Sequence, residues 1–275
     1  MKVNLGLTRA ARYSFAPNHF HYCGPEKQSD MQSYVALHQS DQGLQGILSE
    51  FATLYKYLAM IAYENNIRDP FDSRVVEAYW LGNSLLRKTE YQPLFRLLTD
   101  SLELKKKLSP AQLQKTLTTL DGAVAHHTFH VLNIFKRTGH LPIRHTLETM
   151  DQCRISWGRV INQKSHLRQG FGGQAKINPP AGGQNDNAKF KNYLVEITPL
   201  VLVKNKLTLE KLEIREVISI GLTPKIGDWV SVHWGYVCEV LTKQQLTNLK
   251  YFTELAIQLA NRSHVIPSPA YSYGF

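Results

Sequence analysis

The chain has 275 residues, 43% of them hydrophobic and 20% charged, which is the composition of a globular protein. Its 3 cysteines are too few, and odd in number, for a disulfide framework, so we expect reduced thiols and a cytoplasmic protein. The start lacks the apolar segment of a signal peptide, and no stretch approaches the roughly 18 to 20 apolar residues of a membrane span. We therefore expect no membrane partner.

The formal net charge of +10 raises the question of nucleic-acid binding. The only dense basic run is Lys105, Lys106 and Lys107, and it falls on an amphipathic helical pattern where a solvated face explains it. We therefore do not expect a nucleic-acid partner. A basic surface could equally steer the protein toward an acidic protein.

Helical periodicity dominates the first half of the chain. A run of apolar residues predicts one helix near 43–65, and Asp69 with Pro70 predicts the capped start of the next, through "RVVEAYWLGNSLLRK". Ser109 and Pro110 give the same signal before "AQLQKTLTTL", and a further helix from about 123 to 136 is expected to end near Gly139. Residues 1–150 are thus predicted to form an all-α domain with an N-terminal arm.

Short β-rich runs follow residue 153, including "RISWGRVI", "NYLVEITPLVLV", "LEIREVISI" and "DWVSVHWGYVCEVL". Four or five such strands would leave exposed edges unless they closed into a small barrel. A Gly/Gln/Pro-rich stretch at 165–188 is interpreted as a flexible insertion without chemistry. The predicted fold class is α+β, with an OB-like β-barrel at 151–242 and a C-terminal helix and tail at 243–275.

Two separated motifs carry a family resemblance. Cys153 opens the first β-rich run and is followed by Gly158, Arg159 and Val160. The closing segment "PKIGDWVSVHWGYVCEVL" carries the second motif, which comprises Gly227, Asp228, Val230, Val232, His233 and Gly235. Together with "REV" at 215–217, these segments resemble the hydrogenase assembly chaperones of the HypC/HupF type. Two departures are that Cys153 follows a whole predicted domain and that Trp157 stands where that family has proline.

That resemblance implies a function for Cys153 and His233. In such chaperones the corresponding residues hold an iron centre with cyanide and carbon monoxide ligands, and the partners are a hydrogenase large-subunit precursor or other maturation proteins. Iron or another transition metal also suits a soft thiolate and a neutral imidazole. The whole chain further resembles an uncharacterised prokaryotic family associated with hydrogenase genes, through "YCGPE", "DPFDSRVVEAYWLGN" and "HHTFHVLNIF".

Two histidine-rich segments are further candidate metal ligands. In "HHTFH", His126 and His130 have the i, i+4 spacing of one helix face, with His127 and His130 as an alternative pair. In "PNHFHYCGPE", His19, His21 and Cys23 would share one side of an extended segment. In both segments, ordinary packing of the side chains is the alternative interpretation.

Two further residues receive structural interpretations. Cys238 alternates with outward residues in the last β-rich run, so we expect a small core side chain. Glu77 lies on an otherwise apolar helix, where it could accept a buried hydrogen bond, support a histidine ligand, or simply face solvent.

The leading functional hypothesis is an accessory protein for assembly of a nickel–iron hydrogenase metallocentre, a carrier without turnover of its own. One alternative is a metalloenzyme that uses His126, His130 and Cys23 between the two predicted domains. The other is a protein interaction module that binds no metal. The barrel fold by itself does not define a function. Measuring the metal content of the purified protein distinguishes the three hypotheses.

Overall fold

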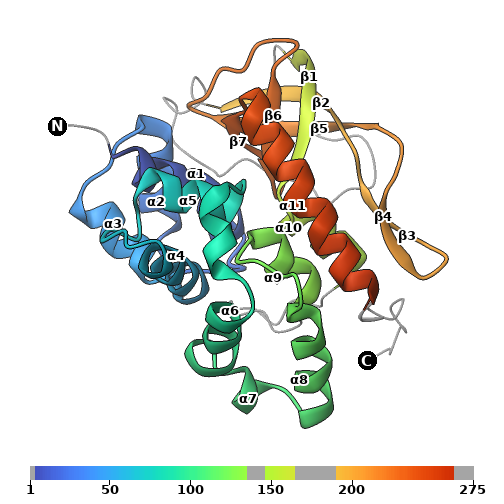
Figure 1. The fold of residues 1–275 in the computed structure, drawn as a ribbon. Helices are drawn as coiled ribbons and strands as arrows, with labels where there is room; N and C mark the ends of the chain where they lie inside the picture. The colour runs from blue at the N-terminus through green and yellow to red at the C-terminus, as the bar shows by residue number, and fades with distance from the viewer. Residues whose placement is uncertain (1–3, 135–145, 165–189, 263–275) are drawn as a thin grey trace, which may run out of the picture.

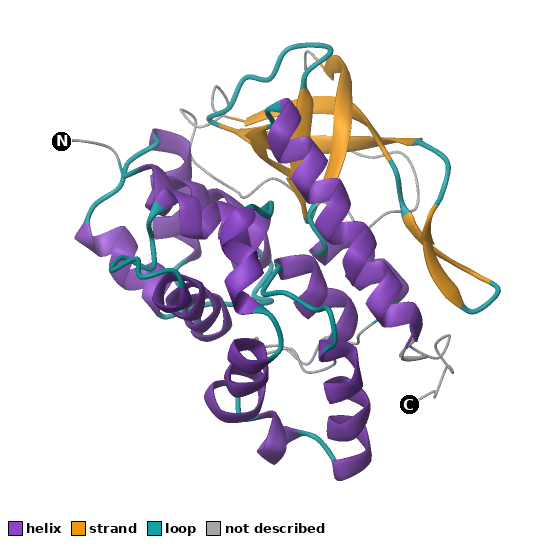
Figure 2. Cartoon of the chain, viewed as in Figure 1, coloured by secondary structure: helices purple, strands orange, loops and turns teal. Residues whose placement is uncertain are grey.

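The computed structural model describes residues 4–134, 146–164 and 190–262. Helices make up the N-terminal half and strands are confined to the C-terminal half (Figure 2). The α-helices before the barrel are α1 Leu5–His19, α2 Gln28–Leu37, α3 Gln42–Ser49, α4 Ala52–Glu64, α5 Ser73–Trp80, α6 Gln92–Arg96, α7 Leu104–Lys107, α8 Pro110–Leu117, α9 His127–Asn133 and α10 Leu147–Cys153. The other helical segments are 3-10 helices at Ser84–Thr89 and Thr118–Leu120 and a π-helix at Leu97–Ser101.

Five strands close into a barrel in the order β1-β2-β5-β7-β6, which confirms the prediction of a small closed barrel. They are β1 Ser156–Lys164, β2 Phe190–Ile197, β5 Glu213–Ile220, β6 Trp229–His233 and β7 Tyr236–Val240. Strands β5 and β7 pair in parallel, and the other barrel pairs are antiparallel. A separate hairpin, β3 Leu200–Val203 and β4 Lys206–Leu209, extends from the barrel (Figure 1).

The barrel interior is filled mainly by β-branched side chains that alternate with outward residues along each strand. This interior cluster comprises Val160, Tyr193, Val195, Ile197, Val217, Val230, Val232 and Val237. A second, larger core is continuous from the helices to other barrel residues, among them Ile218, Trp234, Tyr236 and Cys238. The helices therefore share this larger core with part of the barrel, whereas the barrel interior forms a cluster of its own.

Two elements connect the halves. Helix α1 contacts α2 and α5 on one side and β6 and β7 on the other. Helix α11, Lys243–Arg262, lies against α9 and β4 and confirms the predicted C-terminal helix (Figure 1). Within the described ranges, no helix combines the length and the apolar composition that a bilayer crossing requires.

Several predicted helix boundaries were wrong for identifiable reasons. The single helix near 43–65 is two helices, α3 and α4, because the chain breaks at Phe51, whose buried ring contacts the loop at Gly24. Asp69 does not cap α5. Its carboxylate instead accepts from the Phe71 amide in a turn, and Asp72 caps the helix through the Arg74 amide. The signal at Ser109 was right, since a complete capping box begins α8.

The N-terminal segment is not an extended arm. Asn4 caps the 15-residue helix α1 by accepting hydrogen bonds from the amides of Gly6 and Leu7. The expected helix at 123–136 is shorter: α9 begins at His127 and ends at Asn133, and the expected end near Gly139 lies outside the described residues. The insertion predicted at 165–188 and the tail beyond residue 262 also lie outside them.

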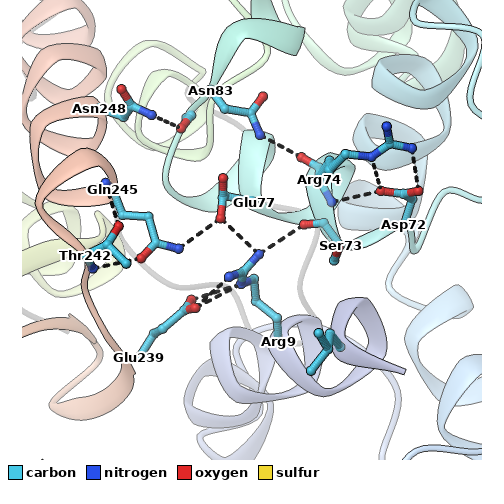
Figure 3. Close-up of polar contacts among 12 residues, drawn as sticks. Arg9, Asp72, Ser73, Arg74, Glu77, Asn83, Glu239, Thr242, Gln245 and Asn248 are labelled. Atoms are coloured by element: carbon cyan, nitrogen blue, oxygen red, sulfur yellow. Dashed lines mark hydrogen bonds and ion pairs between the residues drawn. The ribbon is translucent and has the colours of Figure 1, made fainter. Parts of the chain in front are cut away.

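A buried charge network ties α1, α5, β7 and α11 together (Figure 3). The Arg9 guanidinium donates to both carboxylate oxygens of Glu239, at 2.6 to 3.2 Å, and to the Ser73 carbonyl at 3.0 Å. Its Nη1 lies 3.2 Å from Glu77 Oε2, which also accepts from Gln245 Nε2 at 2.9 Å. The Arg9 and Glu239 side chains are only 15% and 14% exposed, so solvent screens this pair weakly.

We expect Arg9→Ala to lower the free energy of unfolding by about 2 kcal/mol, because two largely buried carboxylates lose their charged partner. Arg74→Ala is the matched control, since the Arg74 side chain is 66% exposed in its pair with Asp72. The control should change stability much less, because solvent screens an exposed ion pair. Urea unfolding of both variants measures the difference, and equal effects would contradict the importance assigned to this network.

Gly158 allows β1 to approach β2 closely. A Cβ atom there would lie 2.3 Å from Val195 Cγ1 and 2.5 Å from the Glu196 carbonyl oxygen. We expect Gly158→Ala to destabilise the barrel by about 1 to 3 kcal/mol through overpacking. Gly46 is at an exposed position of α3, and no atom lies near a methyl group added there. Gly46→Ala should therefore stabilise the protein by about 0.5 to 1 kcal/mol. A thermal melt of the two variants checks the opposite signs.

Candidate metal centre

Three potential metal ligands meet where the helices contact the barrel. His127 is the first residue of α9, Cys153 the last residue of α10, and His233 the last residue of β6. One donor atom of each, the sulfur or a ring nitrogen, lies within 4.8 Å of the other two. His127 and His233 are buried, whereas Cys153 is partly exposed. The chain thus brings together a thiol and two imidazoles from three separate elements.

His233 is oriented by α1. Its Nδ1 lies 2.7 Å from the Tyr13 carbonyl oxygen, which can only accept, so Nδ1 carries the proton and Nε2 has the lone pair. Histidine ligands commonly donate their second nitrogen to a carbonyl in this way. The Tyr13 hydroxyl also bonds Ser231 Oγ on β6 at 2.8 Å, which anchors this helix to the same strand.

His127 is held by two partners. Its Nε2 lies 2.9 Å from the Cys153 carbonyl oxygen and therefore donates, while its Nδ1 lies 3.1 Å from the Tyr79 hydroxyl and accepts. Burial lowers the pKa of His127 well below its ordinary value, and the nearby His233 lowers it further. His127 is therefore neutral near pH 7, as metal ligation requires, and Nδ1 has the lone pair.

The C-terminal end of α10 is fixed by its neighbours on both sides of Cys153. The Asp151 carboxylate accepts from Arg154 Nε at 2.9 Å, from Arg215 Nη2 at 2.6 Å and from the Leu200 amide at 2.8 Å. The Trp234 amide donates to the Gln152 carbonyl at 2.9 Å. Helix α10 is thereby tied to β5, to β3 and to the turn after His233. These contacts fix the position of Cys153 relative to His233.

The donors line a cavity of about 100 Å³. Its other walls are mostly apolar or aromatic and include Pro17, Tyr22, Phe51, Leu54, Tyr79, Trp80, Val131, Ile134 and Trp234. Two more candidate residues, Cys23 and His130, also line it. Nδ1 of His130 lies 3.1 Å from the hydroxyl of Tyr57, whose pKa is raised by burial, so this phenol donates to the imidazole.

Tyr79 lines the cavity and contacts His127. Burial raises the pKa of Tyr79 well above its ordinary value, and negative charge on Tyr57, Cys153 or Cys23 would raise it further. The phenol therefore stays protonated and donates to His127 Nδ1. Tyr79, Cys153 and Cys23 all line the same cavity.

His126 lies apart from the donor group. It is the N-cap of α9, where Nδ1 accepts from the Thr128 amide at 3.2 Å, and its ring stacks on Phe252 of α11 at 5.4 Å. The expected shared helix face of His126 and His130 does not form, because the helix begins only after His126. Burial lowers the pKa of His126 to about 3, so it is a neutral core histidine.

The expected alignment of His19, His21 and Cys23 also does not form, because the segment is not extended. His19 is the last residue of α1 and stacks on Phe15 at 5.5 Å. His21 has left-handed backbone geometry, with φ of 58°, and its ring contacts Gln28 at 3.1 Å. Of the three, Cys23 is the one that reaches the cavity.

Other expectations have clear outcomes. Cys153 ends a helix and does not open β1, which begins at Ser156. Cys238 is fully buried, and burial raises its pKa, as expected for a core side chain. Glu77 forms an ion pair with Arg9 and accepts a hydrogen bond from Gln245, and these contacts involve no described histidine. Sequence patterns gave no sign of the roles of Tyr13 and Tyr79, because both act through contacts between distant segments.

Fold and site together define an α+β protein in which a helical half and a five-stranded barrel enclose a thiol–imidazole group. The chain belongs to DUF6390, a family of unknown function, whose pattern matches residues 2–168 and 184–266. The unmatched residues 169–183 lie within the predicted insertion. No curated protein and no solved structure matches the chain. The resemblance to HypC/HupF chaperones therefore gains no support from these comparisons.

The buried histidines predict acid sensitivity. Because the folded-state pKa of His126 is depressed to about 3, the unfolded chain binds more protons at any pH between that value and about 6.5. Stability should therefore be complete above pH 6.5 and fall as the pH drops below it. His126→Asn retains a capping oxygen and should reduce this slope by up to about 1.4 kcal/mol per pH unit. Unfolding curves from pH 7 to pH 4 measure it. An unchanged slope in His126→Asn would contradict the prediction.

Proposed function

We propose that this protein binds one transition-metal ion through His127, Cys153 and His233 and carries it as cargo during metallocentre assembly. The observation that carries this proposal is the convergence of three donor atoms within 4.8 Å. Sulfur with two imidazole nitrogens is a donor set for iron, nickel, copper, cobalt or zinc, and it disfavours magnesium and calcium. The three thiols of the chain suit the reducing cytoplasm that we expect for such a carrier.

The tautomers of the two histidines support metal binding. With Nδ1 of His233 and Nε2 of His127 donating to carbonyl oxygens, the lone pairs are on Nε2 of His233 and Nδ1 of His127. In His127 that lone pair accepts a hydrogen bond from the Tyr79 hydroxyl. This hydroxyl would rotate to another acceptor when an ion binds. Neutral imidazoles and a deprotonated thiol are the protonation states that ligation requires.

The position of Cys153 argues against a cysteine nucleophile. A helix C-terminus has a partial negative charge, which disfavours a thiolate, and Cys153 is the last residue of α10. A bound cation outweighs this unfavourable effect of the helix end, because it stabilises the thiolate directly. Among the described residues that line the cavity, none is a carboxylate that could act as a general base. A carrier therefore accounts for the site better than a hydrolase.

A metalloenzyme remains the second candidate, and the cavity itself favours it. Three protein ligands beside a space for water or substrate is the arrangement of catalytic zinc sites. His130 and Cys23 line that space and could contact a substrate. Stoichiometric metal that co-purifies with protein expressed alone and resists a chelator favours this enzyme. Protein that is isolated without metal but binds added metal exchangeably, or retains it only with maturation partners, favours the carrier.

The nickel–iron hydrogenase client is part of the proposal and rests on the sequence resemblance. An iron fragment with cyanide and carbon monoxide ligands would be the cargo, and the cavity beside Cys153 would contain its diatomic ligands. The interpretation of the barrel as OB-like is supported by its five strands and single parallel pair. Anaerobic co-purification with the neighbouring gene products, followed by iron and nickel analysis, tests the client directly.

We expect the purified protein to bind one equivalent of Co²⁺ with a sulfur-to-metal charge-transfer absorption. Cys153→Ala should abolish that absorption, and His233→Gln should weaken the affinity by more than about 100-fold, because each removes a direct ligand. Cys238→Ala is the matched control and should bind normally, since that thiol does not line the cavity. Equal binding by wild type and Cys153→Ala would contradict the proposed site.

A further inference from the structure

A second thiol lies on the same cavity. Cys23, in the loop between α1 and α2, lines the space that His127, Cys153 and His233 also line. It does not belong to the group whose donor atoms are mutually within 4.8 Å. The ion held by those three residues would therefore not be bound by Cys23 at the same time without a rearrangement. The position of Cys23 calls for a separate role.

The loop that bears Cys23 has a defined geometry. Asn18, a buried side chain, donates from Nδ2 to the carbonyls of Cys23 at 3.1 Å and Pro25 at 2.6 Å. The Cys23 amide donates to the Pro17 carbonyl at 3.3 Å. Gly24 has φ of +83° and packs so closely on Phe51 that a Cβ would lie 2.3 Å from the ring. The backbone therefore presents the thiol at a fixed place on the cavity wall.

Cys23 is partly exposed, whereas the two histidine ligands are buried. The exposed or partly exposed lining residues of the loop and of the start of α4 form the rim of the cavity, which comprises Tyr22, Cys23, Gly24, Ala52 and Thr53. His127 and His233 are buried, with 7% and 1% of their surfaces exposed. Cys153 is partly exposed and is thus the most accessible of the three ligands. An ion that enters over the rim meets Cys23 before the histidines.

We propose that Cys23 is the capture ligand of this site, which binds the incoming ion first and passes it to Cys153, His127 and His233. This inference rests on the proposed metal-binding function. Soft thiolates suit the role, because they bind transition metals tightly yet exchange between partners. A thiol at the rim also avoids the slow step of direct ligation by two buried imidazoles.

The transfer is a ligand exchange without oxidation or reduction. The Cys23 thiol releases a proton as its sulfur binds the ion. The bond from the ion to the Cys23 sulfur then breaks as the bond to the Cys153 sulfur forms, and the Cys153 proton leaves to solvent. The Cys23 thiolate takes up a proton again, so one proton is released overall. Each imidazole binds the ion through a ring-nitrogen lone pair, and this step releases no proton.

The test separates the rate of loading from the affinity. Stopped-flow mixing of the full chain with Co²⁺ follows the charge-transfer absorption, and competition with a chelator gives the equilibrium affinity. We expect Cys23→Ser, which preserves the size of the side chain, to load at least about tenfold more slowly while the affinity changes less than about threefold. Cys238→Ala should load like wild type. An unchanged melting temperature for Cys23→Ser would confirm that the loop is intact.

Two results would overturn the inference. Loading by Cys23→Ser at the wild-type rate would show that the rim thiol takes no part. A loss of affinity as large as that of Cys153→Ala would make Cys23 a permanent ligand. Either result leaves metal binding by the chain in place. Failure of the proposed function is distinct, because wild-type protein would then give no cobalt–thiolate absorption at all.

Discussion

The arrangement of the site depends on the packing of α1 between the helical half and the barrel. Tyr13, near the middle of this helix, contacts β6 twice: its carbonyl accepts from His233 Nδ1 and its hydroxyl bonds Ser231. The Tyr13 ring also stacks on Trp80 of α5 at 5.1 Å. One residue thereby sets the tautomer of a candidate ligand and links it to both halves. Because these groups are buried, no water is available to replace the contacts if they are broken.

Aromatic packing surrounds the polar groups of the site. The rings of His127 and His233 lie 5.3 Å apart, and Trp80 lies 4.4 Å from the first and 5.6 Å from the second. Such surroundings exclude water and disfavour positive charge on His127, which is why its pKa lies well below the ordinary value. A buried neutral His127 beside a thiol costs stability in acid. It is also ready to bind a cation without first losing protons.

Much of the motif behind the chaperone resemblance has a structural explanation of its own. Gly158 is required by the close approach of β1 and β2, and Val160 fills the barrel interior. Trp234 and Gly235, with φ of 51° and 76°, form the two-residue turn that joins β6 to β7. Small barrels with unrelated functions share such requirements. Only Cys153 and His233 have chemistry beyond the fold, and the proposed function depends on them.

The sequence by itself determined that a helical half precedes a strand-rich half, that the strands close into a small barrel, that a helix follows the barrel and that a helix begins after Ser109, because these follow from local periodicity and turn chemistry. It also marked Cys153 and His233 as a pair. Only the tertiary structure decided which of the adjacent histidines joins them. His126 and His127 differ by one residue, but α9 begins between them, so one ring stacks on α11 and the other faces Cys153. If the start of α9 is placed three or four residues too early, His126 is assigned to the site in place of His127. The direction of each side chain depends on where the helix begins and on what packs against it.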